Sequence, residues 1–413
     1  MIIDAERYNR VCKCGKKHKM TTKACIIERN CISETKKYSK KYGLTGKAVA
    51  IYDDNTYKAA GSIADVHKEI ILSHDGLHAD NTSVDNLLPM IPDDADYLIA
   101  VGSGTVHDLT RYCAYELGLP FVSCPTAASV DGFCSSVAAM TWHGYKKTLT
   151  AVSPTVVVAD LDIISSAPMR LTLSGFGDMI GKYIALADWK IAHLVTGEYF
   201  CEYIYSMTLD ATRAVLESAA GIKSGDISAY EKLTYGLLMS GLAMQLLGNS
   251  RCASGAEHHI SHLIEMRPPG LAASSDALHG EKVGVGTLLA AKEYHKIAND
   301  GSIKFGDYEP ARFGYIEKMF GERLTEAIVT ENLSDVCVGI TGEQIRNCWT
   351  EICGIVRETP TAESLFETYS VLGVKSSLSD IGVADELADT LLEYSPLVRN
   401  RLTLMRLRRA RRK

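Results

Sequence analysis

The chain has 413 residues, of which 46% are hydrophobic and 23% charged, a composition typical of a globular protein with room for two or three domains. No apolar run approaches the roughly 18 residues that cross a bilayer. The start of the chain also lacks the apolar segment of a secretory signal, so we expect a cytoplasmic protein whose cysteines are reduced.

The net charge of −6 conceals an asymmetry, because the last thirteen residues hold seven basic side chains and no acidic ones. The remaining body is more acidic than the total, which argues against nucleic acid as the main partner. We interpret the basic tail as the solvated end of a last helix, where cations are favoured by the helix C-terminus.

The first 35 residues are predicted to form a cysteine-containing extension separate from the domains that follow. Cys12, Cys14 and His18 are close in sequence, and Cys25 and Cys31 follow. A Cys-x-Cys-Gly turn beside a histidine could build a small zinc site. The irregular spacing favours thiols without metal, and we prefer that interpretation.

Residues 36–165 alternate short β-rich runs with helical periods, which predicts a parallel sheet with right-handed crossovers. The expected strands cover residues 47–52, 96–101, 120–124 and 155–159, and a helix is expected from about Tyr57. Beyond Pro168 long helical periods dominate, at about 177–194, 201–220, 230–247 and after His279. The predicted organisation is therefore an α/β domain of residues 36–165 and an α-helical domain of residues 166–413.

A glycine-rich segment, Gly102-Ser103-Gly104-Thr105, stands between a predicted strand and a predicted helix. This arrangement lets free N–H groups at a helix N-terminus face a phosphate. His107 occupies the third glycine position of the dinucleotide-binding fingerprint, so a tight turn without ligand stays an alternative.

A second loop of small residues, Thr126 to Ser129, leaves the next predicted strand. Two such loops at adjacent strand ends indicate a dinucleotide more than a lone phosphate. Asp54 and Asn55 end an earlier strand and could contact the adenosine half. Carboxylates there favour a ribose hydroxyl, which favours NAD over NADP.

Histidines and one acidic turn form the candidate metal site. His258 and His262 are four residues apart and share a helix face, whereas His259 is turned about 100° away. His279 precedes a further helix, and Asp178 follows a glycine-rich turn. A carboxylate with imidazoles suits Zn, Fe(II) or Ni(II), and the alternative is that these histidines are capping or core residues.

Five ordered motifs resemble one family: GSGTVHD, PTAASVDGF, GFGDMIGK, SGAEHHISHLIE and ALHGEKVGVG. Over about residues 47–293 they are similar to the sn-glycerol-1-phosphate dehydrogenases, within the superfamily of iron-containing alcohol dehydrogenase, glycerol dehydrogenase and 3-dehydroquinate synthase. The resemblance implies a Rossmann-like α/β domain followed by a helical catalytic domain, the dehydroquinate synthase-like fold.

The resemblance also implies roles for individual residues. Asp178, His258 and His279 match the metal ligands, with Zn expected first and Ni or Fe as alternatives. Asp131 and His262 match catalytic positions and, with Asp178, substrate-contacting ones. The positions that match nicotinamide-cofactor contacts are Asn55, Gly102, Ser103, Gly104, Thr105, Val106, Thr126, Ala127, Ala128, Ser129 and Ser135.

The implied reaction is the reversible reduction of dihydroxyacetone phosphate to sn-glycerol 1-phosphate with NADH or NADPH, by a homodimer. The metal would polarise the ketone, and His262 could relay the proton because imidazole titrates near neutrality. Lys146, Lys147 and Lys182 are candidates for the substrate phosphate. Alternatives are a dehydrogenase of another small polyol such as glycerol, a dehydroquinate-synthase-like lyase, and a non-catalytic binder that uses the chain ends.

Overall fold

The computed structural model describes residues 1–143 and 145–412, with the backbone alone at Tyr145 and Lys146. The chain folds into two compact units. The first comprises residues 1–179 and 213–249, and the second comprises residues 180–212 and those from 250 onward. This division differs from the predicted boundary near residue 165.

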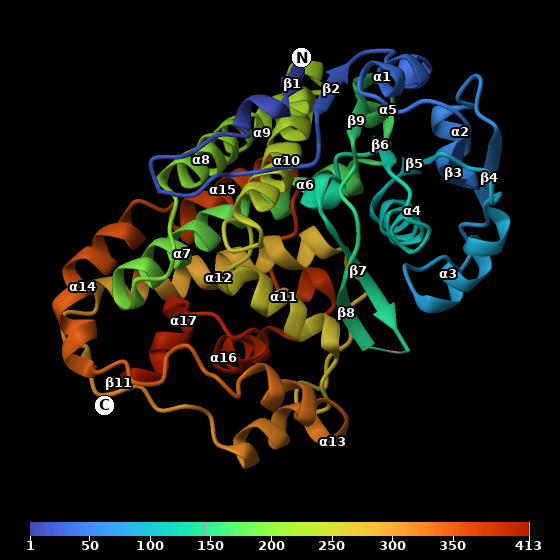
Figure 1. The fold of residues 1–413 in the computed structure, drawn as a ribbon. Coiled ribbons are helices and arrows are strands. Elements are labelled where there is room, and N and C mark those ends of the chain that lie inside the picture. Colours follow the sequence, from blue (N-terminus) through green and yellow to red (C-terminus); the bar gives the residue numbers. More distant parts are fainter. Residues whose placement is uncertain (144, 413) are drawn as a thin grey trace. The chain divides into compact units, whose positions relative to one another are not determined.

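The first unit is built on a seven-stranded sheet in the order β1-β2-β9-β6-β5-β3-β4, whose strands run from blue to green in Figure 1. All neighbouring pairs are parallel except β1, which is antiparallel to β2. The predicted parallel α/β architecture is therefore confirmed. The strands are β1 (Ile2–Asp4), β2 (Ala24–Glu28), β3 (Ala48–Asp53), β4 (Lys68–Leu72), β5 (Tyr97–Gly102), β6 (Phe121–Pro125) and β9 (Val156–Asp160).

Both faces of this sheet are buried, which explains the continuous apolar runs in its central strands. In β5, Leu98 and Ala100 belong to one apolar cluster. The alternating residues Tyr97, Ile99 and Val101 belong to a second cluster. Successive side chains of a strand point to opposite faces, so the two clusters cover the two sides of the sheet.

The predicted N-terminal extension contributes two strands to the same sheet. Residues 24–28 of β2 pair in parallel with residues 156–160 of β9, and β1 pairs with β2. Ala24, Cys25, Ile26 and Ile27 are fully buried. This short apolar run is a central-sheet strand, and residues 1–35 are therefore part of the first unit.

Local capping sets where the first crossover helix begins. We expect a helix from about Tyr57, whereas α2 (Asp54–Ala60) begins three residues earlier. The Asp53 carboxylate accepts a hydrogen bond from the Thr56 N–H, and the Thr56 hydroxyl accepts one from the Asp53 N–H. This reciprocal capping box satisfies helix-terminal N–H groups and fixes the start. The other helices between strands are α1 (Thr35–Lys41), α3 (Asn81–Leu87), α4 (Gly104–Glu116), α5 (Leu161–Ser166) and α6 (Met169–Ile180).

Helix α10 (Ile227–Leu247) also belongs to the first unit, although its sequence lies in the predicted helical domain. A Cβ atom at Gly241 would lie 2.9 Å from the Asp131 carbonyl oxygen, so only glycine allows this approach. The neighbouring segment holds the short helix η4 (Asp131–Cys134) and the hairpin of β7 (Val137–Trp142) and β8 (Tyr145–Thr150). The chain thus returns to the first unit within α8 (Glu202–Glu217), at Arg213.

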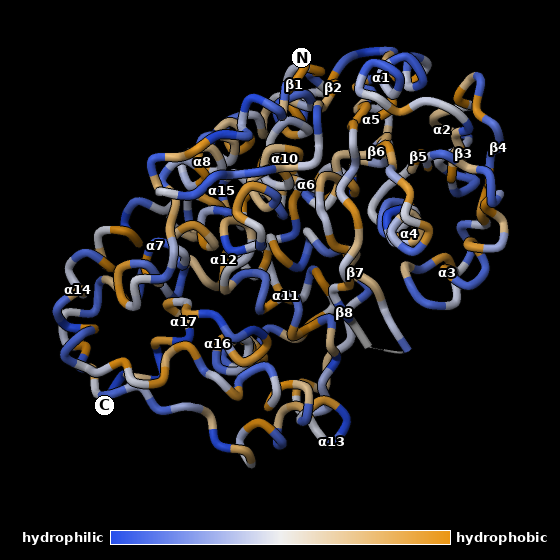
Figure 2. Tube along the Cα trace, in the orientation of Figure 1, coloured by the Kyte–Doolittle hydropathy of each residue, from blue (hydrophilic) through white to orange (hydrophobic). Residues whose placement is uncertain are grey.

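The second unit is helical, as predicted. Orange and blue stretches alternate along α14 in Figure 2, as expected for a helix with one buried face. Its main helices are α7 (Lys182–Thr196), α11 (Ala256–Met266), α12 (His279–Asn299), α13 (Phe313–Glu331), α14 (Gly342–Arg357), α15 (Ala362–Leu372) and α16 (Ala388–Tyr394). None of the helices in the described residues is long and apolar enough to cross a membrane.

A buried carboxylate links four segments of the second unit. Oδ1 of Asp188 accepts hydrogen bonds from the Leu404 N–H at 2.8 Å and from the Tyr294 hydroxyl at 2.7 Å. Its Oδ2 accepts from the Ala256 N–H at 2.9 Å, at the start of α11. Burial raises the pKa of Asp188 to about 7 despite the nearby Arg251. Complete hydrogen bonding compensates for the removal of this group from water.

The basic tail is a structural element of the second unit, so its interpretation as a solvated helix end is wrong. Arg406 is fully buried in α17 (Leu404–Leu407), 2.9 Å from the Asp335 carboxylate. Arg408 pairs with Glu293 at 3.1 Å. The strand β11 (Arg411–Arg412) pairs with β10 (Lys304–Phe305). Arg406 and Arg408 are therefore paired with acidic side chains that are distant in the sequence, whereas the sequence pattern alone predicts that these charges face solvent.

His107 in α4 is a core residue. Its Nδ1 lies 2.9 Å from the Ser103 carbonyl oxygen and its Nε2 lies 2.7 Å from the Ser123 hydroxyl. Burial, together with the charge of nearby Arg111, lowers the pKa of His107 to about 3. The ring therefore stays neutral and joins the first turn of α4 to β6.

We predict that His107→Gln reduces the acid sensitivity of the first unit. Below about pH 6.5 the unfolded chain takes up a proton that the folded chain cannot hold until about pH 3. This difference removes about 1.4 kcal/mol of stability per pH unit in the wild type. The difference in the free energy of unfolding between the wild type and the His107→Gln variant should therefore narrow as the pH falls from about 7 to about 4. Denaturant unfolding at several pH values measures it, and a constant gap would contradict the prediction.

Candidate active site

The glycine-rich segment lies where strand β5 passes into helix α4. A Cβ atom at Gly102 would lie 2.6 Å from the Cβ of Val106, so the turn excludes any larger residue. Ser103 occupies the N-cap position, yet its side chain makes no capping hydrogen bond. The first turn of α4 thus begins with small, partly exposed residues at the positive end of a thirteen-residue helix. This is the expected setting for a phosphate.

The second loop is held directly beside the first. Gly102 and Pro125 are register partners at the ends of β5 and β6, and the Thr126 N–H donates to the Gly102 carbonyl at 2.9 Å. Helix α6 approaches so closely that a Cβ at Gly175 would lie 2.0 Å from the Ala128 carbonyl oxygen. The structure therefore brings residues 102–106 and 126–129 together, as their positions in the sequence predict.

The Ser129 hydroxyl lies in this second loop. Ser129 is 4% exposed, and its Oγ is a buried atom that finds no hydrogen-bond partner among the described residues. Buried polar atoms in proteins are normally satisfied, so an isolated one in a candidate ligand loop suits a bound partner. This supports a cofactor in the loop.

Asn55 shares the same edge of the sheet. It is exposed in the first turn of α2, after β3, and β3 is the neighbour of β5. The chain leaves β3 towards β4 and leaves β5 towards β6, which makes the gap between β3 and β5 a switch point where nucleotides bind. The carboxylates of Asp53 and Asp54 are already used, one in the α2 cap and the other by His74 at 2.6 Å. These carboxylates are therefore less available to bind a ribose hydroxyl, which weakens the predicted preference for NAD over NADP.

Asp131 and Asp178 meet in the first unit. Asp178 is fully buried in α6, and its Oδ2 accepts a hydrogen bond from the Asp131 N–H at 3.0 Å. The Asp131 carboxylate in turn accepts from the Ser240 hydroxyl at 2.8 Å. Ser135 follows at the end of η4, and its hydroxyl donates to the Val137 carbonyl. The two acidic side chains are thus held by neighbours before any ligand binds.

Three histidines cluster in the second unit. The ring centroids of His258 and His262 are 6.0 Å apart on α11, and that of His279, at the start of α12, lies 5.3 Å and 5.8 Å from them. A close approach of the two helices allows this, because a Cβ at Gly286 would lie 2.6 Å from the Glu257 carbonyl oxygen. His259 points elsewhere, as predicted: it is fully buried, and neither ring nitrogen has a partner among the described residues.

Two glutamates that the sequence analysis missed orient these histidines. Glu257 Oε1 lies 2.6 Å from His258 Nδ1. Glu265 lies 3.0 Å from His279 Nδ1 through Oε1 and 3.1 Å from His262 Nδ1 through Oε2. An ionised carboxylate only accepts hydrogen bonds, so each Nδ1 donates and each Nε2 carries the lone pair. Carboxylates behind histidines in this way are typical of metal sites.

The residues around Glu265 keep its carboxyl group ionised. Burial raises the pKa of its carboxyl, but His279 and His262 outweigh that effect and hold the pKa well below its usual range. Lys282 adds an ion pair at 3.2 Å. Burial lowers the pKa of His262 to about 4, although Glu265 raises it. The expectation that His262 titrates near neutrality is therefore not met.

The lysines proposed for the substrate phosphate are in different settings. Lys147 is exposed in β8, and Lys182 is fully buried at the start of α7. The side chain of Lys146 lies outside the described residues. The burial of Lys182 shows that it is no ordinary surface lysine.

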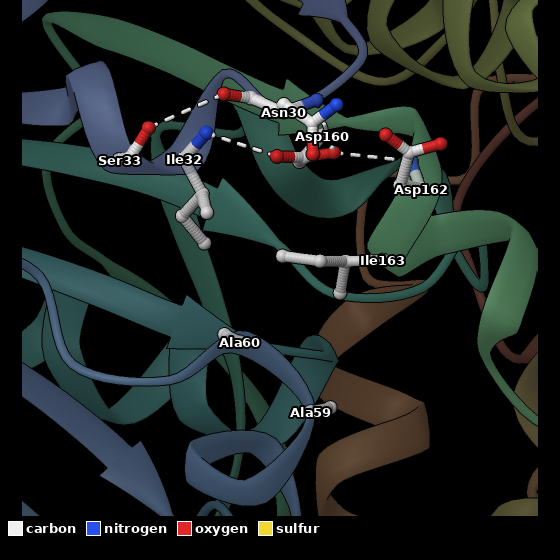
Figure 3. A pocket seen from close by; sticks show the side chains of 8 residues that line it. All are labelled: Asn30, Ile32, Ser33, Ala59, Ala60, Asp160, Asp162 and Ile163. Atoms are coloured by element: carbon white, nitrogen blue, oxygen red, sulfur yellow. Dashed lines mark hydrogen bonds between the residues drawn. The ribbon is translucent and has the colours of Figure 1, made fainter.

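A separate pocket in the first unit lies close to Asp160 (Figure 3), and none of the predicted site residues lines it. The Asp160 carboxylate accepts hydrogen bonds from the N–H groups of Asn30, Ile32 and Asp162. The Asp160 carboxylate therefore holds the ends of β2 and β9 in place.

Comparison with known proteins agrees with this arrangement. Residues 26–168 match the model of the iron-containing alcohol dehydrogenases. A probable glycerol dehydrogenase of Sinorhizobium meliloti superposes with a TM-score of 0.62 at 17% identity, over 94% of both chains. Glycerol dehydrogenase of Schizosaccharomyces pombe gives 0.55 at 22% identity, over 81% of this chain and 89% of that one. These structures establish the fold.

Curated relatives establish the family. Glycerol-1-phosphate dehydrogenase (NAD(P)+) of Geobacillus thermodenitrificans is 40% identical over 269 residues, covering 62% of this chain and 66% of that one, just under two thirds of its length. The enzyme of the same name from Halalkalibacterium halodurans is 34% identical over 421 aligned positions, which cover 98% of this chain and 97% of that one. The chain therefore belongs to the NAD(P)-dependent glycerol-1-phosphate dehydrogenase family.

Proposed function

We propose that this protein catalyses the reversible reduction of dihydroxyacetone phosphate to sn-glycerol 1-phosphate with NADH or NADPH. The observation that carries the proposal is the histidine cluster of α11 and α12. Three imidazoles there are fixed by buried carboxylates, in a chain of this family. The glycine edge of the sheet adds a site suited to a dinucleotide.

We propose Asp178, His258 and His279 as ligands of one divalent ion, Zn²⁺ first, with Ni²⁺ or Fe²⁺ as alternatives. Their donors are one carboxylate and two imidazoles, a set that suits these ions. A bound ion supplies Lewis-acid polarisation of the ketone oxygen. The Asp131 N–H orients the Asp178 carboxylate, and Glu257 and Glu265 orient the two imidazoles.

We propose that residues 102–106 and 126–129 hold the cofactor phosphates and nicotinamide half, with Asn55 and Ser135 as further contacts. Bound NADH or NADPH supplies the hydride, and the oxidised form accepts it in the reverse direction. The Ser129 hydroxyl would gain its hydrogen-bond partner on binding. Close-packed glycines at 102 and 175 keep side chains out of the space beside this edge.

We propose that His262 handles the proton of the substrate hydroxyl. Because Glu265 accepts from its Nδ1, the Nε2 of His262 is an acceptor. It would take the hydroxyl proton when the alcohol is oxidised and return it when the ketone is reduced. Asp131, held by Ser240, is the second polar group that we propose for orienting the substrate.

The direct test is a cofactor-oxidation assay. Dihydroxyacetone phosphate should support oxidation of NADH or NADPH, with unphosphorylated dihydroxyacetone much poorer at equal concentration. Chiral analysis should identify the product as sn-glycerol 1-phosphate. Equal or better turnover of dihydroxyacetone would indicate a glycerol dehydrogenase. Phosphate release without net change in NADH absorbance would indicate a lyase.

We predict that His258→Ala and His279→Ala each lower the metal content and reduce turnover by about 100-fold or more, because losing a ligand should cost at least as much as losing a residue that only orients a ligand. Elemental analysis and initial rates measure the two effects. His193→Ala is the matched control, since this histidine of the second unit is exposed and its Nδ1 hydrogen-bonds to the Glu198 carbonyl. A fully active, metal-free His279 variant would contradict the ligand assignment.

Glu265→Gln tests the shared carboxylate. The two histidines contact different oxygens of Glu265, and in glutamine one of these becomes an NH₂ donor. One histidine should therefore lose its orientation, and Lys282 loses its ion pair. We expect metal affinity or turnover to fall by about 10- to 100-fold. Glu293→Gln serves as control, because this buried glutamate of α12 pairs with Arg408 in the tail. Equal losses in both variants would point to general destabilisation.

A further inference from the structure

The segment of residues 10–18 folds into a tight hairpin in the first unit. Val11 and Lys17 form an antiparallel bridge, and the Cys12 N–H donates to the Lys16 carbonyl at 2.9 Å. The turn closes through the Gly15 N–H, which donates to the Cys12 carbonyl, and Gly15 adopts a φ of +86° that favours glycine. The hairpin brings Cys12 and Cys14 to one side, together with His18.

A backbone carbonyl fixes the tautomer of His18. The ring is 3% exposed, and its Nδ1 lies 3.0 Å from the Leu246 carbonyl oxygen, at the end of α10. A carbonyl only accepts, so Nδ1 donates its hydrogen and Nε2 carries the lone pair. Metal-ligating histidines are commonly oriented in this way by a backbone carbonyl behind the ring.

The distances in this cluster match a zinc site. Nε2 of His18 lies 3.4 Å from the Sγ of Cys14, and the donor atoms of Cys12, Cys14 and His18 all lie within 4.8 Å of one another. With Zn–S bonds of about 2.3 Å and Zn–N bonds of about 2.0 Å, the edge of a tetrahedral site is about 3.5 Å.

The other two cysteines of the N-terminal segment lie elsewhere. Cys25 is fully buried in β2, with its Sγ 4.0 Å from that of Cys134. Burial, with nearby Asp160, raises the pKa of Cys31 to about 12, so it remains a thiol. No disulfide involves any of the twelve cysteines, all of which fall in the described part of the chain. Only Cys12 and Cys14, of the four, share a cluster with a histidine.

We propose that Cys12, Cys14 and His18 bind a structural Zn²⁺ ion. Structural zinc is four-coordinate and takes cysteine and histidine ligands, so these three side chains would supply three of its four positions. The ion would clamp the hairpin, through His18, to the unit that carries the glycine edge. This proposal is independent of the reaction proposed above, because none of these residues belongs to the catalytic set.

The full-length protein tests this proposal without any substitution. Loading with Co²⁺ should give a thiolate-to-cobalt charge-transfer band, which a site of carboxylate and imidazoles cannot produce. Elemental analysis should find two metal ions per chain at saturation. Absence of the charge-transfer band in Co²⁺-loaded wild-type protein would overturn the proposal, whatever the enzymatic activity.

Variants locate the ion. The double variant C12S/C14S should lose the charge-transfer band and one zinc per chain, while His258→Ala should keep both the band and that zinc. Cys348→Ser is the matched control, as a partly buried cysteine outside the cluster. Retention of two metal ions and the full band by C12S/C14S would overturn the site.

Discussion

The candidate active site of this protein depends on two glutamate carboxylates that decide which nitrogen of each clustered histidine holds the proton. Glu257 accepts from His258, and the single carboxylate of Glu265 accepts from both His262 and His279. Without them each imidazole could rotate or change tautomer, and the lone pairs would not face one place. Lys282 and the two histidines together keep Glu265 ionised, and the ionised carboxylate in turn keeps the two histidines oriented.

In the first unit, the candidate ligand edge of the sheet depends on glycines that leave the backbone accessible. Gly102 and Gly175 stand where a single methyl group would collide with Val106 or with the Ala128 carbonyl. Parallel pairing of β3, β5 and β6 places their carboxyl ends on one edge. Position along the sheet and lack of side chains thus combine to make this edge a candidate ligand site.

Much of this could be predicted from the sequence, where the signal was local. The strand ends at Gly102 and Pro125 follow apolar runs with turn residues, and α12 begins at His279 as expected. Features that depend on distant partners escaped prediction. Glu265 is an ordinary helix residue until α12 packs beside it, and Arg406 resembles a solvent-facing charge until Asp335 is placed next to it. Strand β2 was hidden because five residues among scattered cysteines carry too little periodicity.

The return of residues 213–249 to the first unit could not be foreseen for a similar reason. The α10 sequence is a long apolar helix by any local measure, and only the close contact of Gly241 with the Asp131 carbonyl shows where it packs. That contact also places Ser240 beside the Asp131 carboxylate. A helix that sequence alone would assign to the helical domain therefore holds a candidate catalytic side chain in position.

The Asp188 carboxylate has a consequence for how the second unit matures on the ribosome. One of its oxygens accepts from the Leu404 N–H, and the Asp335 carboxylate pairs with Arg406, so each of these two acidic groups lacks one of its partners until those residues have been translated. The start of α11, which leads into the histidine cluster, is hydrogen-bonded to the same Asp188 side chain through the Ala256 N–H. Nascent chains stalled before residue 404 should thus resemble an open, chaperone-dependent intermediate rather than a nearly finished enzyme.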